Sequence, residues 1–568
     1  MKSFRNIICL LLIATVMFSS SLLAEACTTI AAGKDATVDG STLIAHSVDG
    51  WYDERIEIVP GGEHEDGAMV EIYRDPCQDG YRPVELVGEI PQVSETYTYF
   101  DTGYPFMNEK GITIGEHTWS GDYAAFYNGE KALFVIANLQ ALGLQRASTA
   151  KECVQIMGEL AEQYGYADGG ETLLVGDADE VWIFEIAGPG PLWTPDSGKP
   201  GAHWAARRVP DDEIHSGANR SRLGEIDFDD TENFMWSTDI TEYPKELGYW
   251  EEGEPFNYSI VFDTAEDSVT YTCSGRVWRV YDLLANSQNL PLVNEEQALT
   301  DLPFSVKPDE KVSIQDFMAV YYDHYEGSVF DMTTGLAAGP WGNPIRYRAS
   351  RDNKPEEVAR FDWERSIAIY RCSYAFVSQM RPDLPAEIGT VLWYGCDSPD
   401  TTVHVPIYAG TTSVPEEWSN SNRWEFDQDC AWWAFNFVNN WADKGWNIVY
   451  PEIAEKRDAI EAKFFAEQPD IDAAALELYE AGDVDGAKAY LTEYVSNSMD
   501  QVYEEWWAFA WELVGKYNDG MIYNAEERST SGFPYSLEYL EAVGYGQNML
   551  EQHQAIPVEP VDEEIPEG

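Results

Sequence analysis

Early in the chain, alternating apolar and polar positions predict paired β-strands. The first pair is a hairpin with strands over 28–32 and 41–47, joined by a turn region over 34–40. A second hairpin is predicted over 171–188, with its turn at Asp177–Glu180. This part of the chain is therefore expected to contain antiparallel sheet.

A helix is predicted between these hairpins, over 148–164. Thr149 and Glu152 have the spacing of a capping box at its start. The apolar residues that share one helical face are Ala150, Cys153, Val154, Met157, Leu160, Ala161 and Tyr164. Strands, then a helix, then strands again favour an α+β layered domain over a regular parallel βα repeat.

The pattern becomes mostly helical after about residue 410. In the last large element, apolar residues recur at helical spacing, which is typical of core packing: Val502, Trp506, Phe509 and Leu513. We therefore expect a first domain over 27–410 and a helical region over 411–555. The last segment, 556–568, is acidic and Pro-rich and is predicted to be disordered.

The first 26 residues have the pattern of a signal peptide. Lys2 and Arg5 precede an apolar run over 7–18, and Ala24 and Ala26 form a small-x-small cleavage site. The apolar run is too short for a comfortable membrane span, so no membrane insertion is expected. The mature protein is predicted to be secreted or periplasmic, after cleavage between Ala26 and the following cysteine.

The composition is strongly acidic, with 100 Asp and Glu against 36 Lys and Arg and a formal net charge of −64. Such a charge argues against binding to nucleic acid, which depends on basic residues. It also argues against binding to anionic membrane surfaces. The aromatic content of 13% favours a folded protein over acidic disorder. The charge fits either a saline habitat or an ordinary extracellular protein.

Eight cysteines are present, and seven remain once Cys9 is removed with the signal peptide. An odd number leaves at least one thiol unpaired, and we expect that one to be Cys27. The cysteines are widely spaced without a CxxC pair, and no HExxH motif is present. No metal and no cofactor are therefore predicted.

Cleavage after Ala26 would leave Cys27 as the first residue of the mature chain. An N-terminal cysteine carries its own base, because an α-amine with a pKa of ~7.7–8.0 lies next to a thiol with a pKa of ~8.5. The alternatives are a structural cysteine and the acylated cysteine of a lipoprotein. Glu25, two residues before Cys27, fits a lipoprotein signal poorly.

The segment that starts CTTIAAGKDATVDGSTLIAHSVDG at Cys27 resembles the N-terminus of the cysteine dipeptidases of the Ntn-hydrolase superfamily, the dipeptidase A type. Further stretches that resemble this family follow in order at 105–119, 204–227, 324–346, 363–377, 393–410, 431–441 and 506–520. The resemblance implies the four-layer αββα sandwich of Ntn hydrolases, with a helical C-terminal region. It also implies Cys27 as the nucleophile.

Relatives in the superfamily, the bile salt hydrolases and penicillin acylases, imply roles for further residues. Their Arg-x-x-Asp motif falls here on His46 and Asp49. Asp49 is expected to hold the amine and thiol of the nucleophile. His46 departs from the motif, because a neutral imidazole does not replace a permanently charged bidentate guanidinium. Binding of a substrate carboxylate there would be lost or would depend on pH.

Three later residues complete the implied site. Asn219 matches the Asn that polarises the scissile carbonyl or stabilises the oxyanion. Arg365 aligns with a late active-site Arg, and Thr118 stands where relatives carry an oxyanion-hole Asn. The structural alternatives are that Asn219 only caps a loop and that Arg365 only forms a surface ion pair. His324 is expected to be a packing or loop histidine.

The function implied is that of an exported dipeptidase that acts on small peptides through an acyl-enzyme. One alternative is an amidase of the same superfamily, acting on N-acyl amino acids or conjugated bile acids. Another is a non-catalytic, carbohydrate-binding exported protein, which the 20 Trp residues would suit. A homo-oligomer is possible under any of these functions.

Overall fold

The structure is a computed structural model that describes residues 27–74, 85–119, 121, 123–128, 131–263, 270–291, 302–347 and 364–544. The predicted signal peptide (1–26), the acidic tail (556–568) and Cys77 lie outside these residues.

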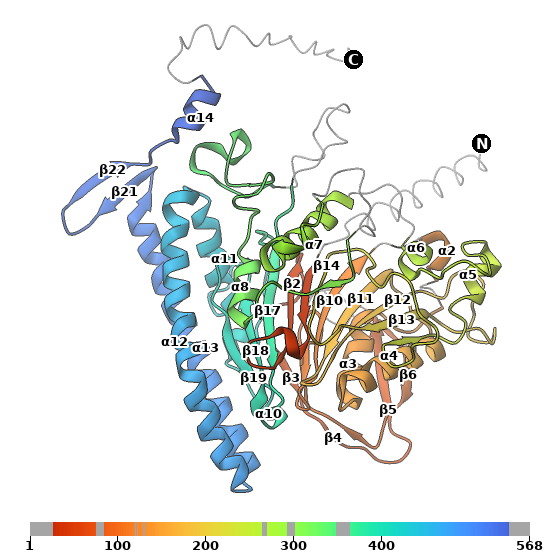
Figure 1. Cartoon of the computed structure of the whole chain (residues 1–568). Helices are drawn as coiled ribbons and strands as arrows, with labels where there is room; N and C mark the ends of the chain where they lie inside the picture. The colour runs from red at the N-terminus through yellow and green to blue at the C-terminus, as the bar shows by residue number, and fades with distance from the viewer. Residues whose placement is uncertain are drawn as a thin grey trace, which may run out of the picture.

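Two antiparallel sheets form the centre of the molecule (Figure 1). The strands of the seven-stranded sheet are, in spatial order, β16 (Ser305–Val306), β14 (Ile214–Gly217), β1 (Thr28–Ala32), β2 (Thr42–Asp49), β17 (Cys372–Met380), β18 (Thr390–Cys396) and β19 (Val405–Tyr408). Those of the eight-stranded sheet are β15 (Phe234–Trp236), β13 (His203–Arg208), β12 (Val181–Ala187), β11 (Gly170–Gly176), β10 (Thr113–Trp119), β9 (Met107–Asn108), β8 (Tyr99–Asp101) and β3 (Glu57–Val59).

Both predicted hairpins are confirmed. The first is β1–β2, with Ile30 opposite Ala45, and the second is β11–β12, which turns at 177–180. The sheets face each other through contacts of β10 with β1 and β2. A glycine permits this close approach, since a Cβ on Gly217 of β14 would lie 2.2 Å from the ring of His117 on β10.

Helices cover the outer face of each sheet. Helices α3 (Ile136–Arg146) and α4 (Ala150–Tyr164) pack on the eight-stranded sheet. Helices α7 (Thr270–Leu284) and α8 (Ile314–Tyr321) pack on the seven-stranded sheet. The order helix, sheet, sheet, helix is the expected αββα sandwich of an α+β protein.

The predicted helix over 148–164 corresponds to α4, and its cap differs in one detail. The Thr149 hydroxyl accepts the N–H of Glu152 at 3.2 Å, as a capping box requires. The Glu152 carboxylate instead accepts the N–H of Ser148 at 2.7 Å, one residue earlier than a capping box would place it. Both bonds satisfy N–H groups at the start of the helix.

The chain after residue 410 is mostly helical, as predicted. Helices α12 (Trp446–Glu480) and α13 (Val484–Lys516) run side by side along one edge of the molecule (Figure 1). Helix α13 contacts β19, and α11 (Ala431–Ala442) contacts β18. The predicted core stripe on α13 is buried: Val502, Trp506, Phe509 and Leu513.

A small sheet that the sequence patterns did not predict follows α13. Its strands are β20 (Tyr517–Asn518), β21 (Met521–Asn524) and β22 (Ser529–Gly532), and α14 (Leu537–Ala542) comes after it. The remaining short elements are η1 (Lys34–Ala36), β4 (Gly62–Glu63), β5 (Met69–Arg74), β6 (Glu85–Pro91), β7 (Glu95–Thr96), α2 (Tyr123–Phe126), α5 (Glu242–Leu247), α6 (Tyr258–Phe262), η2 (Asn286–Gln288), η4 (Leu336–Trp341), α10 (Ala386–Gly389) and η6 (Glu416–Trp418).

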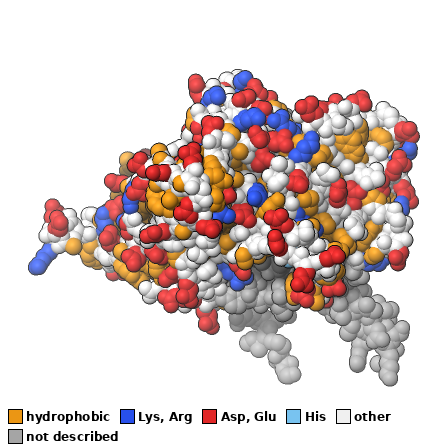
Figure 2. Space-filling view, turned by 90° about the horizontal axis from the view of Figure 1, so that it is seen from below, with side chains coloured by type: hydrophobic (Ala, Val, Ile, Leu, Met, Phe, Trp, Pro, Cys, Tyr) orange, Lys and Arg blue, Asp and Glu red, His pale blue; other side chains and the backbone are white. Residues whose placement is uncertain are grey.

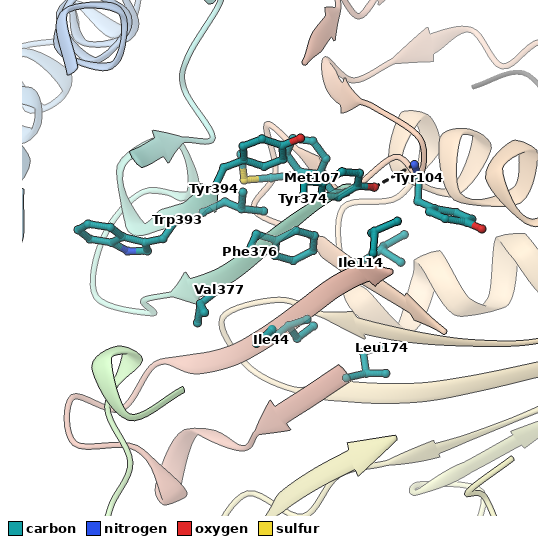
Figure 3. Close-up of a cluster of buried hydrophobic side chains, with 14 of the residues drawn as sticks. Ile44, Tyr104, Met107, Ile114, Leu174, Tyr374, Phe376, Val377, Trp393 and Tyr394 are labelled. Carbon is teal, nitrogen blue, oxygen red and sulfur yellow. Dashed lines mark hydrogen bonds between the residues drawn. The ribbon is translucent and has the colours of Figure 1, made fainter. Parts of the chain in front are cut away.

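The main core includes the space between the two sheets. Ile44 of β2 and Phe376 of β17 lie in the same cluster as Ile114 of β10 and Leu174 of β11 (Figure 3). At its edge, the hydroxyl of Tyr374 accepts the backbone N–H of Tyr104 at 3.2 Å. This bond is drawn in Figure 3 and links β17 to the loop before β9.

Acidic side chains are spread over the surface seen in Figure 2. The six cysteines in the described part of the chain are all free thiols and all buried. Across the same residues, no helix is long and apolar enough to cross a membrane.

Candidate active site

Cys27 lies directly before β1 and is 1% exposed. Its backbone oxygen accepts a hydrogen bond from Arg276 Nη1 at 2.8 Å. Side chains alternate along a strand, so Cys27 is expected to point to the same face as Thr29. Thr29 faces the eight-stranded sheet, because its hydroxyl contacts His117 Nδ1 at 2.9 Å. The thiol therefore lies at the N-terminal end of β1, between the two sheets.

An imidazole and a carboxylate lie next to the thiol. The sulfur of Cys27, a ring nitrogen of His46 and a carboxylate oxygen of Glu116 all lie within 4.8 Å of one another. His46 Nε2 is 3.7 Å from Glu116 Oε2. Gly115 lets the two strands come close, since a Cβ there would be 3.3 Å from the Cβ of His46. His46 of β2 is thereby directed at a buried acid of β10.

Glu171 on β11 adds a second buried carboxyl group. It lies opposite Thr118 in the β10–β11 pairing, and the Thr118 hydroxyl donates to Glu116 Oε1 at 3.0 Å. Burial and the charge of Glu116 raise the pKa of Glu171 well above its usual value. Burial opposes ionisation of Glu116 as well, but contacts with His46 and Glu171 bring its pKa below the usual value. Burial and mutual repulsion thus make it unfavourable for both carboxyl groups to be ionised together.

Asp49 ends β2 and is fully buried. Its Oδ2 accepts a hydrogen bond from Arg365 Nη2, and its backbone oxygen accepts one from Arg371 Nη1 at 2.9 Å. Asp49 Oδ1 is buried and has no hydrogen-bond partner in the described part of the chain. One acceptor atom near Cys27 is thus left available for a donor.

Asn219 follows β14 and has a φ of 53°, in the left-handed region that Asn tolerates better than most residues. Its Nδ2 donates to the backbone oxygen of Thr118 at 2.6 Å, and its Oδ1 accepts from Arg276 Nη2 at 2.8 Å. Arg276 on α7 also donates to the hydroxyl of Thr28 at 2.8 Å. This buried guanidinium ties Asn219 to the backbone of Cys27.

The charges of the site oppose ionisation of the thiol. Burial raises the pKa of Cys27 well above its usual value, and the nearby carboxylates of Glu116 and Asp49 raise it further. His117 does not supply a charge, because burial lowers its pKa to about 3. A base that takes the thiol proton during attack suits this environment better than a preformed thiolate.

The structure brings together all six residues that the sequence predicted for the site. Hydrogen bonds or close contacts connect Cys27, His46, Thr118 and Asn219, and Asp49 and Arg365 form a buried ion pair beside Cys27. The residues that sequence reasoning missed are Arg276, Glu116 and Glu171. Strand alternation could have found Glu116, which is two residues before Thr118 and shares its face.

Sequence reasoning predicted no metal and no cofactor. The thiol, imidazole and carboxylate near Cys27 are ligand types that Zn²⁺ accepts. A zinc ion bound there would occupy the thiol sulfur and block nucleophilic attack. Metal binding and nucleophilic attack through this sulfur are therefore mutually exclusive.

Comparisons with known proteins give the family. The model of "Peptidase family C69" matches residues 26–458. Dipeptidase A of Lactobacillus helveticus is 26% identical over 463 residues, covering 78% of this chain and 86% of that protein. A probable dipeptidase of Latilactobacillus sakei is 25% identical over 406 residues, covering 69% and 76%.

A solved structure of penicillin V acylase from Agrobacterium tumefaciens matches 67% of this chain and 86% of its own. The TM-score is 0.28 and the sequence identity is 13%. The family model covers well over half of the chain and includes Cys27 and every other residue of the site. The chain belongs to peptidase family C69.

Proposed function

We propose that this protein is an exported cysteine dipeptidase whose mature chain begins at Cys27. The relatives named dipeptidases and the match to a peptidase family support the reaction class. The observation that carries the mechanism is the buried thiol of Cys27 at the start of β1, beside the unpartnered Oδ1 of Asp49. The signal-peptide pattern of residues 1–26 supports export.

Removal of residues 1–26 would create an α-ammonium or amine on Cys27. Asp49 Oδ1 is the buried acceptor that would bind and orient this group, and Arg365 holds Asp49 through its other oxygen. The amine acts as the base, because its free form accepts the thiol proton as the sulfur attacks.

The reaction has two steps. In the first, Cys27 Sγ bonds to the scissile carbonyl carbon while its proton passes to the amine. The protonated amine then donates that proton to the leaving nitrogen, the C–N bond breaks, and a thioester remains. In the second, water attacks the thioester as the amine takes its proton, and the thiol and the free acid are released. In this proposal, Asn219 polarises the scissile carbonyl.

The test is hydrolysis of L-alanyl-L-alanine by the mature protein and by a Cys27→Ala variant. We expect the wild-type protein to release alanine and the variant to be inactive but folded, because the change from Cys to Ala removes only the sulfur atom. Cys27→Ser should retain at most a trace, since a hydroxyl is a much weaker nucleophile.

Mass spectrometry of the wild-type protein mixed rapidly with substrate should show an acyl adduct on Cys27. Turnover by Cys27→Ala at the wild-type rate would disprove the assignment. Hydrolysis of N-acyl amino acids or conjugated bile acids, without hydrolysis of dipeptides, would identify the amidase instead.

A further inference from the structure

The proposed mechanism leaves the buried pair Glu116 and Glu171 without a role. Neither carboxyl group is needed to attack the carbonyl or to take the thiol proton. Glu116 even works against the nucleophile, because its charge raises the pKa of Cys27. Burying two carboxyl groups costs free energy unless charges or hydrogen bonds compensate it. Their presence beside the nucleophile therefore needs an explanation.

Several polar atoms of this cluster lack hydrogen bonds. Within the described residues, Glu116 Oε2, Glu171 Oε2 and His46 Nε2 are all buried with no hydrogen-bond partner. The exposed fractions of the three side chains are 0%, 3% and 1%. No Lys or Arg of the described chain forms an ion pair with either glutamate, and His46 is 3.7 Å from Glu116. The site thus holds a buried negative charge that a bound cation would complement.

A dipeptide places such a cation at the right distance. Its α-nitrogen is about 2.5 Å from the carbonyl carbon of the same residue. The attacking sulfur approaches that carbon to about 3–3.5 Å before reaction. The α-nitrogen is therefore within about 6 Å of the sulfur. A carboxylate oxygen of Glu116 lies within 4.8 Å of the same sulfur. These distances from the sulfur allow an ammonium group to come within hydrogen-bond range of Glu116, and Glu171 contributes to the charge around Glu116.

We propose that Glu116 and Glu171 bind the α-ammonium of the substrate and restrict this enzyme to peptides with a free N-terminus. The inference rests on the proposed dipeptidase function and assigns the residues that select its substrate. Binding of the ammonium neutralises Glu116, so the charge that opposes thiol ionisation is cancelled only when the correct substrate is present. A substrate with a blocked N-terminus leaves that charge uncompensated.

The amine of Cys27 itself is the competing ligand for this pair. Asp49 is the better partner for that amine, because its side chain lies on the face of β2 that is turned away from Glu116 and the opposite sheet. Register places Thr28 opposite Ser47, and Asp49 is two residues farther on the same face. Thr28 contacts Arg276 of α7, so this face points to the helices. Glu116 approaches from the opposite sheet.

The experiment compares L-alanyl-L-alanine with propionyl-L-alanine, which has the same shape but lacks the ammonium. We expect the mature protein to favour the dipeptide by at least about 30-fold in kcat/KM, the usual scale for losing one partner of a buried ion pair. In Glu116→Gln and Glu171→Gln, the kcat/KM ratio between the dipeptide and propionyl-L-alanine should fall toward one, mainly because KM for the dipeptide rises. Hydrolysis of propionyl-L-alanine should stay level or rise.

Glu185→Gln is the matched control. Glu185 is a buried carboxylate on β12 of the same sheet, held by the Ser221 hydroxyl and by the N–H groups of Arg222 and Leu223. Its replacement should leave the ratio between the two substrates unchanged. Thermal unfolding of every variant separates loss of fold from loss of selectivity.

An equal fall for both substrates in the Glu116 and Glu171 variants would show that the pair acts on the nucleophile and would overturn the inference. Calorimetric binding to the Cys27→Ala protein separates this inference from the proposed function. Tighter binding of L-alanyl-L-alanine than of propionyl-L-alanine, lost in Cys27→Ala/Glu116→Gln, supports ammonium recognition even where wild-type turnover is absent. Equal binding of both compounds would refute it.

Discussion

At the scale of residues, the site separates into two groups around Cys27. Glu116 and His46 lie on the side of the thiol, and Asp49 and Arg276 lie toward the helices. In the proposed mechanism, Asp49 binds the amine of the nucleophile and Glu116 binds the substrate.

Six residues of the site were predicted from the sequence, because they stand in segments that resemble the family: Cys27, His46, Asp49, Thr118, Asn219 and Arg365. His46 and Asp49 follow from the resemblance, because the Arg-x-x-Asp motif of the superfamily falls on them. Arg276 was not predicted, because it belongs to a helix that only the tertiary fold brings to the N-terminus of β1. Arg365 was predicted from the resemblance alone, and in the structure it forms an ion pair with Asp49.

The charge of Glu116 gives a prediction for the pKa of the nucleophile. Burial is the largest cause of the raised pKa of Cys27, and Glu116 comes next. A neighbouring negative charge disfavours the thiolate, so Glu116→Gln should lower the thiol pKa. The measurement is the rate of alkylation by iodoacetamide as a function of pH, with Cys27→Ala as the background for the other thiols. An unchanged or higher midpoint in Glu116→Gln would contradict the electrostatic description.

At the scale of elements, local patterns were enough for the hairpins β1–β2 and β11–β12 and for α4. Their alternation and helical periodicity agree with the burial that the fold imposes. The strands β20–β22 were missed, because they are short and mostly exposed and so carry no apolar alternation.

His324 connects three elements, as a packing histidine should. It follows α8, lies 3.2 Å from Asp400 beyond β18, and packs edge-on against Trp446 of α12. Glu326 provides a second carboxylate at 3.0 Å. Burial alone would lower the pKa of His324, but Asp400 and Glu326 raise it to about 10.

His324→Gln should therefore destabilise the protein in a way that depends on pH. The pKa of His324 is higher in the folded protein than the value of ~6.5 in the unfolded chain, so its protonation stabilises the folded state. This stabilisation is complete below pH ~6.5 and is lost as the pH rises toward 10. We expect the free energy of unfolding to fall by about 3 kcal/mol at pH 6, the scale for breaking a buried ion pair. Chemical denaturation at pH 6, 8 and 10 measures the difference from wild type. A difference that does not shrink between pH 6 and pH 10 would argue against a charged histidine.

At the scale of the whole molecule, composition predicted a folded acidic protein but not its layers. The α+β class followed from the order of elements, and the αββα arrangement followed from family resemblance. The number of tryptophans suggested a sugar-binding protein as an alternative, but many of these side chains are packed in the core. The fully buried tryptophans are Trp119, Trp182, Trp193, Trp393, Trp418 and Trp506.

The net charge of −64 predicts a dependence of stability on salt. Folding concentrates like charges, and the Debye length falls from ~30 Å at 0.01 M salt to ~3 Å at 1 M. The midpoint unfolding temperature should therefore rise markedly with NaCl and equally with KCl. Differential scanning calorimetry in both salts measures this change. A flat or falling temperature in both would mean that charge repulsion does not limit stability.

We propose the amine of Cys27 as the catalytic base, and a change confined to that group tests the proposal. Two forms of the mature chain are prepared by proteolytic removal of a fusion partner, one beginning at Cys27 and the other with a single Gly before it. The added Gly leaves every side chain in place but turns the amine of Cys27 into an amide, which is not basic. We predict that the form beginning at Cys27 hydrolyses L-alanyl-L-alanine, and that the extended form is at least about 100-fold slower, the low end of the contribution of a general base. Equal activity of the two forms, with intact mass confirming that the Gly is retained, would contradict the account.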